Sequence, residues 1–363
     1  MEHLNKKKWN LFKIKDIFNV SGTTTTHPSK LIQNEQSKTP RITCSSLNNG
    51  LDDTYSNNAT ENGNVITIDS ATVGYISYQV SDFIATDHVE KLSCKHKINR
   101  YLGLFLVTAI KNATLNKFNY GYKFSQERIK MQKILSPIND NGEPDYEYMK
   151  QYAMSVINKK INVYKKYILS VLEKIEFKEI PKLKEKEWKA FFIGGEQGIF
   201  QISSSSSGID KNKLECSVDA LKIPYVTRTD LNNGINDFIS DIQKNKYKMD
   251  EGNVITIGLD TQTVFYQPYQ FYAGQNIQVL RHENLNEFNA EFLVPLIKVQ
   301  MKKFNWGGNG ATLGRLFKTK LMLPIDNNEN IDWGFMEQYT MNIIYKKIKQ
   351  YLGFSGAPNE QYV

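Results

Sequence analysis

Apolar residues along this 363-residue chain occur mostly in short runs, and in two segments their spacing changes to that of a helix. The short runs are rich in β-branched residues and end at turn signals such as Asn49-Gly50 and Asn233-Gly234, which predicts strands. In the two other segments apolar residues recur every three or four positions. We therefore predict helices over about 145–176 and 332–352, with Asp145 as the cap of the first.

The whole pattern occurs twice. Gly-Asn-Val-Ile-Thr-Ile at 63–68 returns unchanged at 252–257, and Leu-Asn-Asn-Gly at 47–50 returns at 231–234. Lys-Phe-Asn followed by an aromatic residue starts at Lys117 and again at Lys303. Because these motifs return in the same order at nearly the same offset, the chain is a tandem duplication.

The duplication predicts an α+β fold with two tandem β-rich domains, 1–143 and 184–330. Each domain is followed by a long helix, at 144–178 and 332–353. The two amphipathic helices could bury their apolar stripes on one another as an antiparallel coiled coil. The alternative is that each packs on its own domain, which is the commoner fate of a single amphipathic helix. The length of the first helix and the matching pattern of the second favour the pair.

Composition narrows the classes of protein. The chain has 46 Lys+Arg against 38 Asp+Glu, a net charge of +8, which is compatible with a polyanionic partner. Only six of the cations are Arg, which favours diffuse phosphate attraction over many bidentate base contacts. Three cysteines without a CxxC spacing argue against a disulfide framework and a structural zinc site. The lack of an apolar leader and of a long apolar run predicts a soluble cytoplasmic protein.

The order of these motifs resembles that of restriction–modification specificity subunits, those of Type I systems and more closely those of BcgI-like Type IIB systems. The likeness rests on the Trp-x-x-Phe starts at 9–12 and 188–191, the Leu-Asn-Asn-Gly turns, the Gly-Asn-Val-Ile-Thr-Ile strands and the Lys-Phe-Asn segments. It covers almost the whole chain. Each motif is weak alone, and their duplication in one order makes the resemblance specific.

The resemblance implies that each β-rich unit is a target recognition domain for half of a bipartite, asymmetric site in double-stranded DNA. It also implies that the helices set the spacing of the half-sites and dock a methyltransferase subunit. A nuclease subunit, or a fused restriction-modification subunit, would complete the complex, and these partners would carry S-adenosylmethionine and Mg²⁺. The alternative is a duplicated β-rich protein-interaction module whose helices oligomerise it.

Hydroxyl-rich runs follow the first predicted strand of both copies. Short hydroxyls can donate to phosphates or base edges, and a flexible, solvated turn is an equal alternative. The candidate DNA-binding residues of these runs are Thr23, Thr24, Thr25, Thr26, Ser204, Ser205 and Ser206.

Further candidates lie in the loops where the two copies differ. Beside the Leu-Asn-Asn-Gly turns they are Ser45, Ser46, Arg228 and Thr229. Arg228 could form two hydrogen bonds to the O6/N7 edge of guanine, or an ordinary surface ion pair. After the repeated strand they are Ser70, Thr72, Tyr78, Gln262, Thr263 and Tyr266, with Gln267. Gln suits adenine and Tyr suits phosphate, but strand alternation would bury about half of the set.

Aromatic residues interleaved with cations mark a third pair of loops, a composition that suits contact with nucleic acid. The candidates there are Tyr120, Tyr122, Lys123, Trp306, Asn309 and Arg315. Phe118 and Phe304 are kept in both copies, so we predict that they are core residues.

The sequence shows no catalytic set. It lacks the tetrapeptide of an amino-methyltransferase, a glycine-rich S-adenosylmethionine loop and an acidic nuclease cluster. The glycine-rich segment 194–198 lacks the Lys-Ser/Thr of a P-loop. Cys94 and His96 have no second pair, so we interpret them as structural rather than metal-binding. We therefore predict a non-catalytic subunit without a metal or cofactor of its own.

Overall fold

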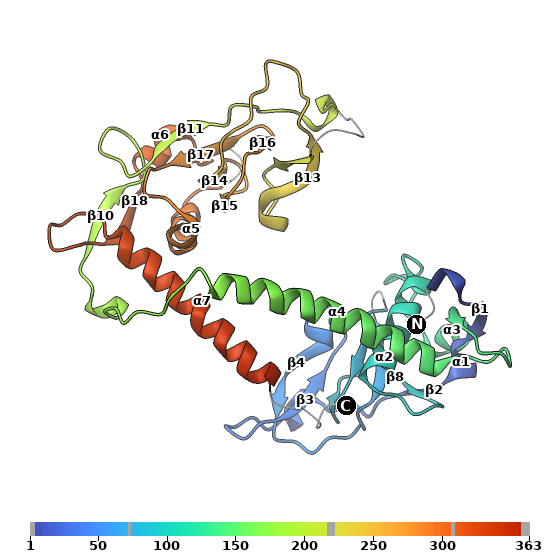
Figure 1. Ribbon diagram of the computed structural model, residues 1–363. Helices are drawn as coiled ribbons and strands as arrows, with labels where there is room; N and C mark the ends of the chain where they lie inside the picture. The colour runs from blue at the N-terminus through green and yellow to red at the C-terminus, as the bar shows by residue number, and fades with distance from the viewer. Residues whose placement is uncertain (1–3, 72–73, 216–221, 306–308, 357–363) are drawn as a thin grey trace. The chain divides into compact units, whose positions relative to one another are not determined.

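The computed structural model describes residues 4–71, 74–215, 222–305 and 309–356 (Figure 1). Their internal contacts divide them into two compact units, one ending at Tyr167 and the other spanning Ile168–Gly356. In both units strands form the same sheets in the same spatial order, with helices packed on them. The prediction of an α+β fold with two tandem β-rich domains is confirmed.

The strands of the first unit form three small sheets among the described residues. The four-stranded antiparallel sheet has the order β2 (Phe18–Gly22), β8 (Val89–Cys94), β5 (Val65–Asp69) and β6 (Ile76–Gln79). The three-stranded sheet has the order β4 (Leu51–Tyr55), β3 (Thr39–Ile42) and β7 (Ile84–Ala85), with β3 and β7 parallel. The two-stranded sheet pairs β1 (Trp9–Lys13) with β9 (Lys133–Pro137), which joins the start of the unit to its later part.

Helices complete the first unit. They are α1 (Ile14–Ile17), α2 (Arg100–Thr114), α3 (Gln126–Met131) and α4 (Tyr146–Leu172). Helix α2 packs on β5, β6 and β9, and α4 continues past Tyr167 into the second unit.

The second unit repeats this arrangement. Its four-stranded sheet has the order β11 (Gln201–Ser204), β17 (Ile277–Arg281), β14 (Val254–Gly258) and β15 (Val264–Gln267). Its other sheets are β13 (Ile235–Ser240), β12 (Lys222–Val226) and β16 (Tyr272–Ala273), and the pair β10 (Trp188–Phe192) and β18 (Lys320–Pro324). Its helices are α5 (Glu287–Met301), α6 (Leu313–Phe317) and α7 (Trp333–Gly356).

The repeated Val-Ile-Thr-Ile strand is the centre of both cores. Every residue of β5 and of β14 is buried, which explains why both strands are rich in β-branched residues. The registers agree as well, because Ile66 lies opposite Leu92 and Ile255 lies opposite Leu280. The two cores are therefore two versions of one packing arrangement.

Helices α2 and α5 were not predicted from the sequence, whose pattern there indicated short strand-like runs. Their start signal is the same in both copies. The Asn99 side chain accepts from the N–H of Leu102 at 3.1 Å, and the Asn286 side chain accepts from the N–H of Asn289 at 3.0 Å. Pro295 lies inside α5 and conceals that helix in the pattern, because proline usually breaks one.

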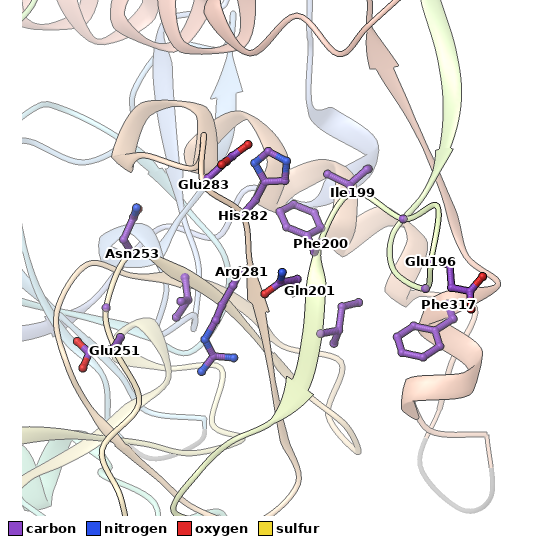
Figure 2. A pocket seen from close by; sticks show the side chains of 15 residues that line it. Glu196, Ile199, Phe200, Gln201, Glu251, Asn253, Arg281, His282, Glu283 and Phe317 are labelled. Carbon is purple, nitrogen blue, oxygen red and sulfur yellow. The ribbon is translucent and has the colours of Figure 1, made fainter.

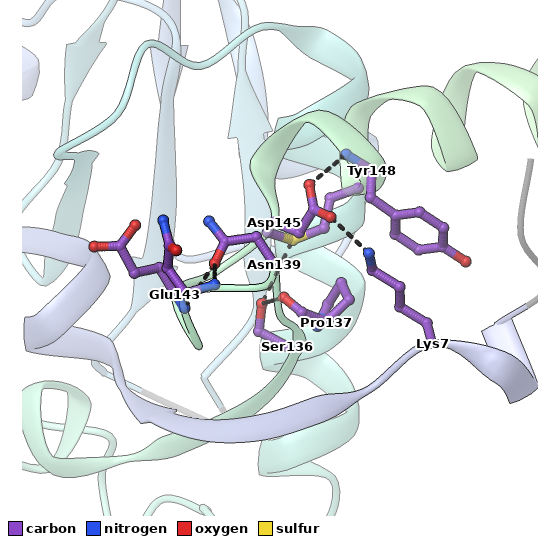
Figure 3. A network of polar contacts seen from close by, with 9 residues as sticks. Lys7, Ser136, Pro137, Asn139, Glu143, Asp145 and Tyr148 are labelled. Carbon is purple, nitrogen blue, oxygen red and sulfur yellow. Dashed lines mark hydrogen bonds and ion pairs between the residues drawn. The ribbon is translucent and has the colours of Figure 1, made fainter.

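The long helices α4 and α7 start on matching aspartates. Asp145 Oδ1 accepts from the N–H of Tyr148 at 3.0 Å, and its Oδ2 lies 2.7 Å from Lys7 Nζ (Figure 3). Asp332 makes the same two contacts, with the N–H of Phe335 at 2.8 Å and with Lys186 Nζ at 2.7 Å. Burial alone would raise the pKa of Asp145, but the bonds from Lys7 and Tyr148 outweigh it and lower that pKa. The predicted cap at Asp145 is confirmed.

Removing this cap should destabilise the helix that it starts. We expect Asp145→Ala to lower the free energy of unfolding by about 1–2 kcal/mol, because an N-terminal N–H and Lys7 both lose their acceptor. Chemical denaturation measures the change, and Asp140→Ala, on an exposed turn, is the matched control. Equal stabilities of the two variants would contradict this role of Asp145.

Helix α4 ends at Leu172, four residues before the predicted limit. The chain then runs extended along α7 within the second unit, where the N–H of Lys178 donates to Asn342 Oδ1 at 3.1 Å and Asn342 Nδ2 donates to the carbonyl of Lys178 at 2.7 Å. Helix α7 also packs on α5. The antiparallel coiled coil stays a prediction. Among the described residues, no helix is both long and apolar enough to cross a membrane.

Candidate nucleic-acid interface

A buried carboxylate holds the hydroxyl run of the first unit. The N–H of Thr24 donates to Glu61 Oε1 at 2.6 Å, and Glu61 Oε2 pairs with Lys91 Nζ. The side chain of Glu61 is 4% exposed. The hydroxyl of Thr23 donates to the carbonyl of Val89, whereas Thr24 and Thr25 are exposed. The run is therefore held in place by hydrogen bonds and carries hydroxyls on its surface.

In the second unit a different ion pair holds the hydroxyl run. The N–H and hydroxyl of Ser206 donate to Asp250 at 2.9 and 3.0 Å. Arg281 Nη2 lies 2.8 Å from Asp250 Oδ1, and the Asp250 side chain is fully buried. Ser204 and Ser206 are exposed, and Ser205 is half-buried. In both units the backbone of the hydroxyl run is ordered by hydrogen bonds, and a DNA contact by its hydroxyls stays a prediction.

The Glu61 network should make stability depend on pH. Burial would raise the pKa of Glu61, but Lys91 and the N–H of Thr24 outweigh it and lower the pKa below the usual 4.5. A lowered folded-state pKa gives stability above the unfolded-state pKa, and this stability is lost as pH falls through the folded-state value. We expect the melting temperatures of the wild type and of Glu61→Gln to differ at pH 7 and to approach one another as pH falls below 4.5. A constant difference across that range would contradict this.

Buried glutamines anchor the Leu-Asn-Asn-Gly turns. Gln79 Nε2 donates to the carbonyl of Asn49 at 3.0 Å, and Gln267 Nε2 donates to that of Asn233 at 3.0 Å. Both amides also bond to the threonine of the repeated strand, Thr67 or Thr256. Gln267 is 2% exposed, so its interpretation as an adenine reader was wrong.

Two more candidates after the repeated strand lie inside their unit. Tyr78 is 6% exposed and donates to Asn64 Oδ1 at 2.6 Å, and Ser70 is 7% exposed and donates to Glu90 Oε1 at 2.9 Å. Tyr266 makes the matching bond to Asn253 Oδ1 at 2.9 Å and is half-buried. Thr72 lies outside the described residues. Because Tyr78 and Ser70 are buried, we do not propose them as DNA contacts.

The remaining candidates of these loops lie near the surface. Gln262 and Thr263 are half-buried in the turn after β14, where Gln262 Nε2 donates to the carbonyl of Asp260 at 2.7 Å. Ser45 and Thr229 are half-buried and Ser46 is exposed. Arg228 is half-buried and forms an ion pair with Asp260, a partner that the sequence did not single out.

Cations stack on aromatic rings in the loop that follows Lys117. Tyr120 is 77% exposed and Tyr122 is 51% exposed. Lys123 Nζ lies 5.3 Å from the ring centre of Tyr120, and Arg128 lies 3.8 Å from that of Tyr122. Phe118 and its counterpart Phe304 pack against the two cores, as predicted. Exposed aromatics beside cations are suited to contact with a nucleic acid backbone.

The matching loop of the second unit contributes to a basic groove of about 490 Å³. The described residues that line it include four cations and no carboxylate: Lys303, Arg315, Lys318 and Lys320, with Phe304, Asn309 and Thr319. Arg315 Nη1 donates to the carbonyl of Gly310, and Asn309 Nδ2 donates to that of Lys303. Trp306 lies outside the described residues. The groove joins the predicted Asn309 and Arg315 to two lysines, Lys318 and Lys320, that the sequence alone did not single out.

A second hollow in this unit, of about 830 Å³, has a different character (Figure 2). Three of its lining residues are glutamates (Glu196, Glu251 and Glu283), and its Arg281 is bound to Asp250. This excess of carboxylates disfavours phosphate. The neighbouring Gly-rich segment is a tight turn, since a Cβ on Gly198 would lie 2.3 Å from the Cα of Gly194.

The described residues contain no group of three His, Cys, Asp or Glu side chains able to hold a metal ion. His96 stacks on Tyr146, with ring centres 4.4 Å apart, and His282 stacks on Trp333 at the same distance. Burial raises the pKa of Cys44 to about 12. Its thiol is therefore a poor nucleophile.

Comparisons with known proteins agree with the duplication. The family model of the Type I restriction modification DNA specificity domain matches residues 6–166 and again residues 185–352. The specificity subunit S.BcgI of a Type II restriction enzyme from Heyndrickxia coagulans is 29% identical over 357 residues, which are 95% of this chain and 97% of that protein. The crystal structure of a Type I restriction-modification system S subunit from M. genitalium has a TM-score of 0.59, with 12% identity over 97% of this chain and 93% of that chain. This last likeness is one of fold.

Proposed function

This chain belongs to the family of Type I restriction modification DNA specificity domains and is a specificity subunit of a restriction–modification system, and from that premise we propose that its two units read two different half-sites of one bipartite DNA sequence. The observation that carries the proposal is a shared framework with different surface loops. Gln79 and Gln267 make the same bonds, whereas Cys44 stands where the second unit has Arg228.

Phosphate contacts would position the units on the DNA. The basic groove of the second unit offers four cations, and the first unit offers Lys123 and Arg128 beside exposed tyrosines. Base reading would fall to nearby polar side chains. The exposed or half-buried residues that we propose for DNA contact by the first unit are Thr23, Thr24, Thr25, Thr26, Ser45, Ser46, Tyr120, Tyr122 and Lys123. Those that we propose for the second unit are Ser204, Ser205, Ser206, Arg228, Thr229, Gln262, Thr263, Tyr266, Asn309 and Arg315.

The roles of the domains, the helices and the partner subunits follow from the same premise. We propose target recognition domains at 1–143 and 184–330 and spacer helices at 144–178 and 332–353, which pair as an antiparallel coiled coil. Chemistry would come from a methyltransferase subunit with a nuclease subunit, or from a fused restriction-modification subunit, carrying S-adenosylmethionine and Mg²⁺. In this scheme the chain itself is not catalytic. Family membership does not favour the alternative of a protein-interaction module without a DNA role.

The proposal can be tested with the chain bound to its methyltransferase partner. We expect this complex to select, from a library of random DNA duplexes, two short conserved blocks separated by a spacer of fixed length and free sequence. Binding should weaken steeply as salt rises, because phosphate contacts release counterions. A complex that enriches no sequence would refute the proposal.

A further inference from the structure

We infer that Arg228 reads a guanine in the half-site of the second unit, and that Asp260 holds its guanidinium in position for this contact. The inference rests on the proposed DNA reading. It goes beyond that proposal because it assigns one residue pair to one base and names the unit whose half-site contains it.

One nitrogen of the guanidinium is bound to a carboxylate, and the arginine side chain is partly exposed. Arg228 Nη1 donates to Asp260 Oδ2, and the same oxygen lies 3.2 Å from Asn276 Nδ2. The Asp260 side chain is 19% exposed, against 41% for Arg228. The carboxylate is therefore held by two donors and is less exposed than the arginine.

The loop that carries Asp260 is itself rigid. The N–H of Gly258 donates to the carbonyl of Thr263 at 2.9 Å, and the N–H of Leu259 donates to that of Asn276 at 2.9 Å. A Cβ on Gly258 would lie 2.5 Å from Thr263 Oγ1, so a larger residue there would displace a threonine side chain of the loop. Asp260 thus stands on a fixed support.

This arrangement favours a base edge over a phosphate. A carboxylate beside the arginine lowers the net positive charge of the site and so weakens its attraction for a phosphate. It also orients the planar guanidinium, which reduces the entropy lost when the guanidinium forms two parallel hydrogen bonds. The O6 and N7 acceptors of guanine match such a pair of donors.

The first unit cannot make the same contact. The N–H of Thr43 donates to the carbonyl of Gly50 at 2.8 Å and that of Thr227 to Gly234 at 2.8 Å, so the following residues, Cys44 and Arg228, occupy equivalent positions. Cys44 Sγ donates instead to the backbone carbonyl of His88 at 3.4 Å. A cation with a carboxylate support in one unit and a thiol in the other would make the half-sites differ at this point.

The test is to select DNA sequences with the methyltransferase complex of the wild type and of Arg228→Ala, Arg228→Lys and Asp260→Asn. We expect Arg228→Ala to lower the preference for guanine at one position of one block by about 5- to 100-fold and to leave the other block unchanged. Arg228→Lys should lose the guanine preference as well, because lysine lacks the planar pair of donors of arginine. Asp260→Asn should lower the same preference with the other positions intact, which a merely structural role would not produce. Lys189→Ala, which breaks an exposed ion pair of the same unit, is the control.

Two outcomes would overturn the inference while leaving the proposed function in place. An unchanged motif in Arg228→Ala would make the pair an ordinary surface ion pair. Equal weakening on all sequences, with a less steep salt dependence, would make Arg228 a phosphate contact. Melting temperatures of the five complexes identify a variant that fails to fold. If Arg228→Ala is such a variant, the guanine preference of Arg228→Lys decides the case. A wild-type complex without any motif would refute the proposed function, and this inference with it.

Discussion

Asp250→Ala is expected to lower the free energy of unfolding of the second unit by about 3 kcal/mol. Asp250 is fully buried and accepts from the N–H and the hydroxyl of Ser206 as well as from Arg281. Without it, a backbone N–H of the hydroxyl run and a partly buried guanidinium lose their acceptor together. This loss is larger than that of a surface ion pair, which contributes at most about 1 kcal/mol.

Tryptophan fluorescence during denaturation is a suitable measure, because Trp188, Trp306 and Trp333, three of the four tryptophans in the sequence, belong to the second copy. Asp210→Ala, which breaks the exposed pair of Asp210 with Lys213, is the matched control and should change stability by less than about 0.5 kcal/mol. Asp250→Asn keeps the shape and loses the charge, so it should fall between the two. If Asp250→Ala matched the control, the carboxylate would not be what orders the hydroxyl run.

The triple variant Lys303→Ala, Lys318→Ala, Lys320→Ala should weaken DNA binding by the methyltransferase complex by about 10- to 100-fold at ~0.1 M salt. All three lysines are exposed and line the basic groove. Because phosphate contacts carry no sequence information, the loss should be the same on specific and non-specific duplexes. The slope of log affinity against log salt should become less steep by about 2–3 units, roughly one for each phosphate that a lysine no longer neutralises.

The control removes the same number of charges elsewhere on the second copy and its linker. Lys182→Ala, Lys184→Ala, Lys189→Ala changes the net charge equally, and these lysines are also exposed. Titration of a labelled duplex at several salt concentrations separates a local contact from a general loss of charge. Equal effects of the two triple variants would show that the groove is not a phosphate site.

The repeat made much of the fold predictable. A motif kept in both copies marks the framework, as the buried Val-Ile-Thr-Ile strands and the paired caps Asp145 and Asp332 show. The same rule applied to Gln79 and Gln267, or to Tyr78 and Tyr266, would have identified them as framework residues before the structure did. Helices α2 and α5 were not predicted, because their apolar faces lie among strand-like runs and because Pro295 lies within α5.

The candidate surface was less predictable, because it depends on contacts between loops far apart in the sequence. Arg228 could be singled out as one of few arginines, but its partner Asp260 is 32 positions away and has no distinguishing spacing. The carboxylates that hold the hydroxyl runs, Glu61 and Asp250, likewise lie distant in the chain from Thr24 and Ser206. Hydrogen bonds across such separations follow from the fold and leave no local pattern.

The most direct test of the central claim is to change the loops of one unit at a time and to select DNA sequences again with the methyltransferase complex. Thr24→Ala, Thr25→Ala, Ser46→Ala removes exposed hydroxyls of the first unit, and Arg228→Ala, Gln262→Ala, Asn309→Ala alters the second. If each unit reads its own half-site, the first triple variant changes only one block of the bipartite motif and the second changes only the other. Both blocks changing together in each variant, or neither changing, would contradict the assignment of one half-site to each unit.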